Sequence, residues 1–178
     1  MKKAIVITAI VALTIGVGGG IWLKTRLDAQ TVAGMAQEQK QEQPKSKYDV
    51  GPPDAQEILE LVNKERARIG VAPLEVDPRI NASAQEKADD MISRNYRDHV
   101  SPEGIHGYEL VFKHTGGECR HASENLTWRT DNNSDTSRDA FNSWMNSEPH
   151  RKALQDSKYT KTGVGINKDI VVQHFCQP

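Results

Sequence analysis

The sequence predicts one α+β domain, because helix patterns come first, strand patterns lie at the end and the two do not alternate. The chain has 178 residues, 37% of them hydrophobic, which suits one ordinary domain with appendages. Its net charge of −1 divides into +3 before residue 54 (seven basic, four acidic) and −4 from there on (sixteen basic, twenty acidic). A mildly acidic domain binds nucleic acid poorly, so we expect no nucleic-acid partner.

Residues 1–28 are predicted to be a membrane anchor or a signal peptide. Residues 4–23 carry no charge, and as a helix that rises about 1.5 Å per residue they are long enough to cross a bilayer. The flanking basic residues bias the N-terminus weakly toward the cytoplasm, so the remainder would lie outside. A cleaved signal peptide ending at Gly34-Met35-Ala36 and a cytosolic protein with a chance apolar start are the alternatives. We expect a cell-membrane protein with an extracytoplasmic domain, or a secreted one after cleavage.

Residues 29–53 are predicted to be a flexible linker. They contain five Gln, three Pro and a single aromatic residue, Tyr48. A segment of this composition buries too little apolar surface to offset the entropy lost on ordering. The folded domain is therefore expected to span residues 54–178.

Two helices are predicted at the start of this domain. The first begins at Asp54, where Glu57 completes a capping-box pattern, and ends at Gly70. The second begins at Asp77-Pro78, an N-cap residue followed by proline, and ends near Asn95. Apolar residues at helical spacing form the inner face of each helix: Ile58, Leu61, Val62 and Ile69 in the first, and Ile80, Ala84, Ala88, Met91 and Ile92 in the second.

A third helix is predicted after an irregular stretch rich in Gly and His. Thr136 and Asp139 open it, and Pro149 starts one short further turn. In the irregular stretch, Glu124-Asn125-Leu126 is predicted to form a turn. The inner face of the third helix is expected to consist of Ala140, Phe141, Trp144 and Met145.

A β-hairpin is predicted at the C-terminus. Val164 and Ile166 alternate with glycines, residues 170–176 are β-branched and aromatic, and residues 167–169 supply turn chemistry between them. The short segment 74–76 is expected to join the same sheet.

Cys119 and Cys176 are the only cysteines, and an even pair in an exported domain predicts a disulfide bond. The alternative is two unrelated buried thiols. Neither cysteine lies in a catalytic signature, so we expect no Cys nucleophile.

Histidines are confined to the part of the chain after residue 98. No zinc-peptidase, zinc-deaminase, esterase or phosphate-loop motif accompanies them. A metal site would have to be assembled from distant segments. The alternative is that each histidine is a surface or hydrogen-bonded structural residue. The six residues are His99, His106, His114, His121, His150 and His174.

The order of five separated motifs resembles that of the CAP superfamily, also called the SCP domain, in its bacterial form. The resemblance covers residues 54–178 and implies a three-layer α-β-α sandwich. The motifs are Leu61-Val62-Asn63-Lys64-Glu65-Arg66, Asp98-His99 with Ser101-Pro102 and Gly104, Glu124-Asn125-Leu126, Trp144 to Arg151, and Gly163-Val164-Gly165.

The same resemblance implies a cleft that binds zinc or another divalent metal. His99, Glu124 and His150 resemble three of the family's two His and two Glu residues. Where secreted eukaryotic members have the second Glu, this chain has Ser147. Glu148, one position later, is therefore taken as the fourth candidate metal ligand. The alternative is that His99, Glu124 and His150 form a buried, hydrogen-bonded polar cluster without metal.

Family members are secreted or surface proteins, several of which bind sterols or other lipids. We therefore expect an extracytoplasmic binding protein whose His/Glu cleft takes a divalent metal or a small amphipathic or cell-envelope ligand. The expected partners are a lipid, a cell-envelope component or a surface protein. One alternative is a zinc-assisted hydrolase of peptide or cell-wall substrates with Glu124 or Glu148 as general base. Another is a surface adhesion or interaction module, and the oligomeric state stays open.

Overall fold

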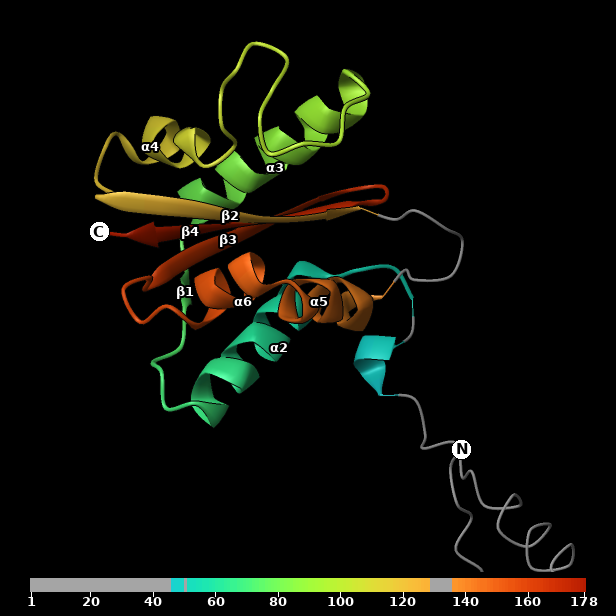
Figure 1. Ribbon diagram of the computed structural model, residues 1–178, viewed down its shortest axis with the longest axis vertical. Helices are drawn as coiled ribbons and strands as arrows, with labels where there is room; N and C mark the ends of the chain where they lie inside the picture. The colour runs from blue at the N-terminus through green and yellow to red at the C-terminus, as the bar shows by residue number, and fades with distance from the viewer. Residues whose placement is uncertain (1–45, 50, 129–135) are drawn as a thin grey trace, which may run out of the picture. The chain divides into compact units, whose positions relative to one another are not determined.

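The computed structural model describes residues 46–49, 51–128 and 136–178 of the chain. Within these residues a β-sheet lies between two layers of helices, as Figure 1 shows. This architecture confirms the predicted mixed α+β class. One face of the sheet carries α3 (Pro78–Ser93) and α4 (Glu109–Thr115), and the other carries α2 (Ala55–Arg68), α5 (Ser137–Asn146) and α6 (Glu148–Gln155).

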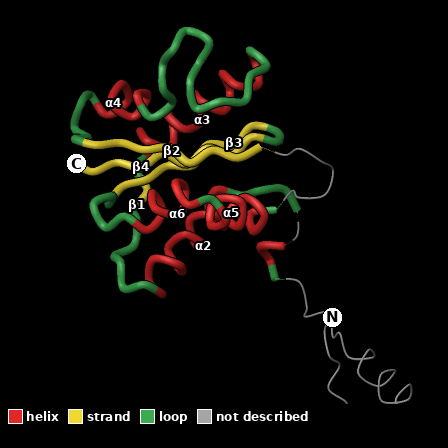
Figure 2. Tube along the Cα trace, viewed as in Figure 1, coloured by secondary structure: helices red, strands yellow, loops and turns green. Residues whose placement is uncertain are grey.

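The described part of the sheet has four strands, β1 (Glu75–Val76), β2 (His121–Trp128), β3 (Lys161–Asn167) and β4 (Ile170–Gln177). They lie side by side in the order β1-β3-β4-β2 (Figure 2), so β2 is an edge strand. The pair β1/β3 is parallel, while β3/β4 and β2/β4 are antiparallel. The predicted C-terminal hairpin is confirmed as β3 and β4, and the predicted 74–76 segment joins the sheet as β1.

Strand β2 and helix α4 form in the stretch that the sequence predicts to be irregular. The predicted turn at Glu124-Asn125-Leu126 is wrong, because these residues lie inside β2, where Glu124 pairs with His174 of β4. Strand β2 contains few of the β-branched and aromatic residues that mark strands in a sequence. Its conformation comes from the ladder that all eight of its residues form with β4.

The N-terminus of α2 differs in one detail from the predicted capping box. Asp54 caps the helix as expected, because its Oδ1 accepts hydrogen bonds from the backbone N–H of Gln56 and Glu57. The reciprocal bond from the backbone N–H of Asp54 goes to Ser137 Oγ at 3.0 Å, and Ser137 Oγ–H donates to Glu57 at 2.8 Å. A residue of α5 thus completes the cap of α2 and ties the two helices together. A complete capping box is formed by Thr136 and Asp139, which open α5.

Helix α3 contacts the sheet through two glycines of β3. A Cβ atom at Gly163 would lie 2.1 Å from the backbone N of Asn81, and one at Gly165 would lie 2.3 Å from the backbone C of Ala84. No side chain fits at these distances, so the glycines allow helix and strand to meet at backbone contact. The Asn81 side chain closes the contact by accepting a hydrogen bond from the N–H of Val164 at 2.9 Å.

Apolar side chains fill the space on both sides of the sheet. Trp144 of α5 is fully buried on the face that carries α2, α5 and α6, together with Phe175 of β4. On the face that carries α3, one cluster of buried apolar residues consists of Ala84, Ala88, Met91, Leu126, Ile170 and Val172, and a second consists of Ile80, Val111, Cys119 and Cys176. The inner-face residues Ile58, Leu61, Val62, Ile80, Ala84, Ala88, Met91, Ala140 and Trp144 are buried as predicted, whereas Ile69 lies exposed at the end of α2.

A buried guanidinium holds the ends of several segments together. Arg66 of α2 is 1% exposed and donates from Nε to the carbonyl of Ala72 at 2.7 Å. Its Nη1 donates to the carbonyls of Leu154 and Asp156, and its Nη2 to that of Tyr159. Five N–H donors in a planar fork suit this set of carbonyls, whereas a lysine ammonium would reach fewer of them. Arg66 therefore anchors the C-terminal end of α6 and the start of β3 to α2.

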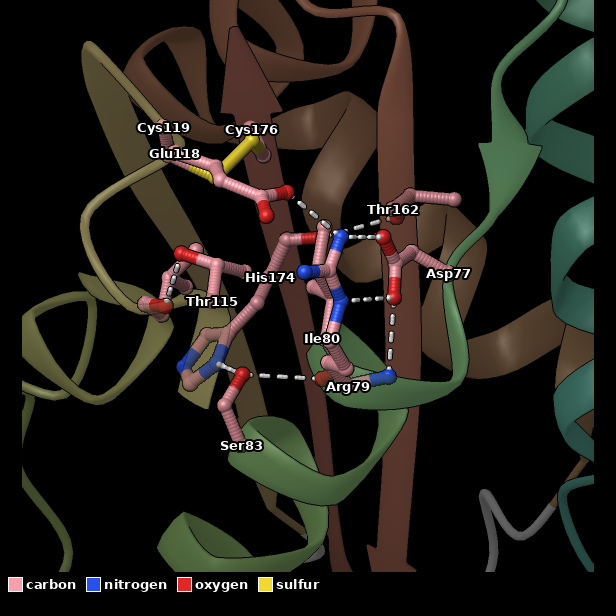
Figure 3. The surroundings of a disulfide bond; sticks show 11 residues. Asp77, Arg79, Ile80, Ser83, Thr115, Glu118, Cys119, Thr162, His174 and Cys176 are labelled. Atoms are coloured by element: carbon pink, nitrogen blue, oxygen red, sulfur yellow. Dashed lines mark hydrogen bonds and ion pairs between the residues drawn. A yellow bond between two sulfur atoms is a disulfide. The ribbon is translucent and has the colours of Figure 1, made fainter. Parts of the chain in front are cut away.

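The predicted disulfide is confirmed between Cys119 and Cys176, which are 57 positions apart. Figure 3 shows that it connects the segment before β2 to the last strand. Beside it, Arg79 at the start of α3 forms an ion pair with Glu118 at 2.9 Å. The covalent bond thus restrains the two strands that carry Glu124 and His174.

The N-terminal predictions concern residues that the structure does not describe. The anchor or signal segment 1–28 and the linker up to residue 45 lie outside the described ranges. Among the described residues no helix is long and apolar enough to cross a bilayer. At the end of the predicted linker, Lys47–Asp49 form a short 3-10 helix, and Tyr48 donates a hydrogen bond to Glu60 of α2 at 2.9 Å. The domain boundary at residue 54 stays a prediction.

We expect Gly165→Ala to lower the free energy of unfolding by about 3 kcal/mol or more, since the new methyl group meets backbone atoms of α3 that cannot rotate away. Urea unfolding measures the change. The control is Gly104→Ala, whose methyl group meets nothing within 4 Å but whose φ of +84° is unfavourable for alanine, at about 1 kcal/mol. Equal losses in the two variants would show that the helix contact is not the cause.

Candidate functional site

A buried carboxylate, that of Glu124, forms the centre of a polar cluster on the α3 side of the sheet. Glu124 lies on β2 and is 8% exposed. Its Oε1 accepts a hydrogen bond from His99 Nδ1 at 2.6 Å, and its Oε2 accepts one from His174 Nε2 at 2.9 Å. Both carboxylate oxygens are therefore occupied by imidazoles from two distant segments.

The surroundings keep this carboxylate ionised. Burial alone would raise the pKa of Glu124. The hydrogen bonds from His174 and His99, aided by the positive charge of Lys87, outweigh burial and hold the pKa below its ordinary value. Glu124 is thus a fixed negative charge at neutral pH.

His174 was not among the predicted site residues. It is fully buried in β4, and its Nδ1 lies 2.8 Å from Ser83 Oγ of α3. Ser83 is also fully buried and bonds to the carbonyl of Ile80 at 2.8 Å. One signal for His174 is present in the sequence, because it is the one imidazole in the run of apolar residues that forms the last strand.

The loop between α3 and α4 presents His99 to the carboxylate. The carbonyl of His99 accepts hydrogen bonds from the backbone N–H of Gly107 at 2.8 Å and from Lys87 Nζ at 3.0 Å. Val100 and His106 form a β-bridge, so residues 99–107 fold back on themselves like a hairpin. Lys87 is 2% exposed, and its ammonium lies over the ring of Tyr96. Helix α3 therefore holds the loop in place through the hydrogen bond from the buried Lys87 to the carbonyl of His99.

Gly107 covers the carboxylate from the loop side. A Cβ atom at this position would lie 1.9 Å from Glu124 Oε2, which is far inside contact distance. The absence of a side chain is what allows the loop and the carboxylate to lie together. This requirement was not visible in the sequence, since Gly107 resembles any other loop glycine.

His150 reaches the cluster from the opposite helix layer. It lies in the first turn of α6, and its carbonyl accepts a hydrogen bond from Asn125 Nδ2 at 3.0 Å. Its Nε2 lies 3.4 Å from His99 Nε2, with the ring centroids 5.6 Å apart. Burial, together with the neighbouring His99, lowers the pKa of His150 although Glu124 opposes the shift. His150 is therefore a neutral imidazole at pH 7.

The two Nε2 atoms have a separation that suits a metal ion. Since His99 donates from Nδ1 to Glu124, its Nε2 carries a lone pair that points at His150. Two nitrogen ligands of a tetrahedral zinc ion are about 3.3 Å apart when each bond is about 2.0–2.1 Å long. Glu124 then lies behind a ligand histidine, the usual place of an orienting carboxylate. The same distance also fits a weak N–H···N contact between the rings.

Glu148, the fourth predicted ligand, lies away from this cluster. Its side chain is 66% exposed and forms an ion pair with Lys152 at 2.6 Å. Ser147, which precedes it, accepts a backbone hydrogen bond from Arg151 and so starts α6. No group of three or more His, Cys, Asp or Glu able to hold a metal ion occurs among the described residues. The four-residue ligand set stays a prediction, whereas His99, Glu124 and His150 do lie together.

Residues 59–175 match the family model described as the cysteine-rich secretory protein family, CAP. Two proteins of Bacillus subtilis strain 168 are similar in sequence. YkwD is 35% identical over 108 residues, which cover 61% of this chain and 40% of YkwD. The membrane protein YlbC is 36% identical over 120 residues, which cover 67% of this chain and 33% of YlbC. The chain therefore spans less than half the length of these relatives.

Solved structures show the same fold. An extracellular protein containing an SCP domain from Bacillus anthracis superimposes with a TM-score of 0.63 and 29% identity, over 70% of this chain and 40% of that one. An outer surface protein from Borrelia burgdorferi superimposes with a TM-score of 0.60 and 21% identity, over 67% of this chain and 89% of that one. The second likeness concerns the fold alone.

We expect Gly107→Ala to displace the Glu124 carboxylate, because the new methyl group would lie only 1.9 Å from Oε2. The hydrogen bonds to His99 and His174 should weaken together, at a cost of about 1–3 kcal/mol in unfolding free energy for an unsatisfied buried group. Thermal unfolding and the imidazole NMR signals of both histidines provide the measurement. Unchanged signals for the two rings would contradict the close contact.

We expect the free energy of unfolding to fall as the pH drops from about 7.5 to 5.5, in part through His150. Its folded pKa is lowered, so the unfolded chain takes up the proton first, below about pH 6.5, and protonation favours unfolding. The stabilising effect is complete above that pH and is lost toward the lower folded pKa. His150→Gln should flatten the profile in this window, and identical slopes in both proteins would contradict the assignment.

Proposed function

Because the chain belongs to the cysteine-rich secretory protein (CAP) family, we propose that its domain is an extracytoplasmic binding domain in which His99 and His150 hold a divalent metal such as zinc. The observation that carries this proposal is the 3.4 Å separation of the two Nε2 atoms, with Nδ1 of His99 already bonded to Glu124. When bound, zinc supplies a Lewis acid with open positions for donor atoms of a ligand.

Three observations support a location outside the cytoplasm. A disulfide is typical of proteins that fold in an oxidising compartment. The similar Bacillus anthracis protein is extracellular, and the similar YlbC is a membrane protein. The uncharged segment 4–23 has the length of a membrane span or signal segment. We propose that the domain is anchored to the membrane or released after cleavage.

The residues of the cluster suit binding better than turnover. A general base needs an accessible oxygen within hydrogen-bond reach of the group that it deprotonates. Glu124 has both oxygens bonded to imidazoles, and Glu148 is exposed and paired with Lys152. Neither Glu124 nor Glu148 is therefore placed to act as the general base of a zinc-assisted hydrolase. A lipid, a cell-envelope component or a surface protein remains the proposed ligand.

We expect the purified full-length chain to bind close to one zinc ion, as measured by elemental analysis and calorimetry, and its melting temperature to rise with zinc. His99→Ala and His150→Ala should each weaken binding by about 100-fold or more, because each removes one of two protein ligands. His121→Ala, which removes an exposed imidazole at the start of β2, is the matched control and should bind like the unaltered chain. If the unaltered chain binds no zinc, the proposal is wrong, and His99, Glu124 and His150 form a structural hydrogen-bonded cluster.

A further inference from the structure

We propose that His174, together with Ser83, is a positioning residue that aims the Glu124 carboxylate at His99 and so decides which nitrogen of His99 stays free. The proposal extends the proposed function, because the free nitrogen is the one assigned to the metal. The part of the proposal that concerns the orientation of Glu124 and His99 applies to the protein without metal.

Because His174 is fully buried, its two ring nitrogens need hydrogen-bond partners inside the protein. His174 and Ser83 are both 0% exposed, and Figure 3 shows them facing each other between β4 and α3, beside the disulfide. A fully buried imidazole is costly unless both of its ring nitrogens find hydrogen-bond partners. The neighbours of His174 on the same face of β4 are Val172 and Cys176. If the position only had to fill space in the core, an apolar side chain would pack there as well.

Both ring nitrogens of His174 are held, so the ring has one orientation. Nδ1 lies 2.8 Å from Ser83 Oγ, and Nε2 lies 2.9 Å from Glu124 Oε2. Rotation of the imidazole about χ2 would break both contacts. Since Ser83 is in α3 and Glu124 is in β2, the ring links the helix to the edge strand across β4.

A carboxylate fixed at Oε2 leaves one direction for Oε1. Gly107 closes the space beside Oε2, since even a Cβ atom there would lie 1.9 Å from it. The remaining oxygen points at His99 Nδ1, 2.6 Å away. An ionised carboxylate accepts hydrogen bonds and donates none, so the proton of His99 resides on Nδ1. Nε2 of His99 is then the lone-pair nitrogen, and it faces Nε2 of His150.

Without His174, the Glu124 carboxylate and the His99 ring would no longer be held in a single orientation and tautomer. Without its bond at Oε2, the carboxylate can rotate or admit water, and His99 can move its proton to Nε2. A proton on Nε2 blocks the nitrogen assigned to the metal. Residues that hold a ligand histidine from behind typically change metal affinity by about 10–100-fold when mutated.

The test compares His174→Leu, which removes both nitrogens, with His174→Gln, whose amide N–H can still donate to Glu124. Ser83→Ala removes the second support of the ring and leaves the core volume almost unchanged. The matched control is His114→Gln, because His114 also bonds to a glutamate, Glu86, at 2.6 Å but lies on α4. In each full-length variant, ¹⁵N NMR of the imidazoles without metal reports the tautomer of His99. Competition with a chromophoric chelator reports the affinity for zinc.

We expect the Nδ1–H tautomer of His99 in the unaltered chain, its loss in His174→Leu and its retention in His174→Gln and His114→Gln. The zinc dissociation constant should rise about 10–100-fold in His174→Leu and stay within about threefold in His174→Gln. An unchanged His99 tautomer in His174→Leu, or no rescue by His174→Gln, overturns the proposal. If His174→Leu does not fold, Ser83→Ala provides the test. An unchanged His99 tautomer in Ser83→Ala would then overturn the proposal. If the unaltered chain binds no zinc, the metal function fails, while the tautomers still decide the role of His174.

Discussion

The buried charge of Glu124 is the constraint on which the rest of the site depends. A carboxylate withdrawn from water costs several kcal/mol unless hydrogen bonds and opposite charges replace the solvent. In this domain the replacement comes from His99 in a loop, His174 in the last strand and Lys87 in α3. These three segments adopt their positions only when the sheet has formed and α3 has packed on it. The site is therefore complete only in the folded domain.

Strand β2 connects this charge to the opposite helix layer. Successive side chains of a strand leave opposite faces, so Glu124 and Asn125 serve different layers. Glu124 holds His99 above the sheet, and Asn125 holds the backbone of His150 on the other side. The two imidazoles meet although they come from different layers. A ligand held between them would therefore couple the loop after α3 to the start of α6.

Much of this organisation is readable in local sequence patterns. Asp54, Asp77-Pro78 and Thr136 act as helix starts because capping depends on a few neighbouring residues. The C-terminal hairpin and the Cys119–Cys176 disulfide also agree with their local signals. The order of the motifs indicated the CAP family, which the family match confirms. The resemblance to that family also implied a metal site at His99, Glu124 and His150. The three side chains lie together, and the metal site stays a prediction.

The sequence by itself determined the fold class, the helix starts, the hairpin, the disulfide and the family, because each depends on short-range patterns or on the order of motifs. Only the tertiary structure decided that Glu124 lies in a strand, since β2 is held by its pairing with β4 rather than by β-propensity. Only the structure brought His174 and Ser83 behind Glu124 and set Gly107 against its carboxylate. These contacts join residues far apart in the chain, and a buried polar contact exists only after the register, the loop and the helix have come together.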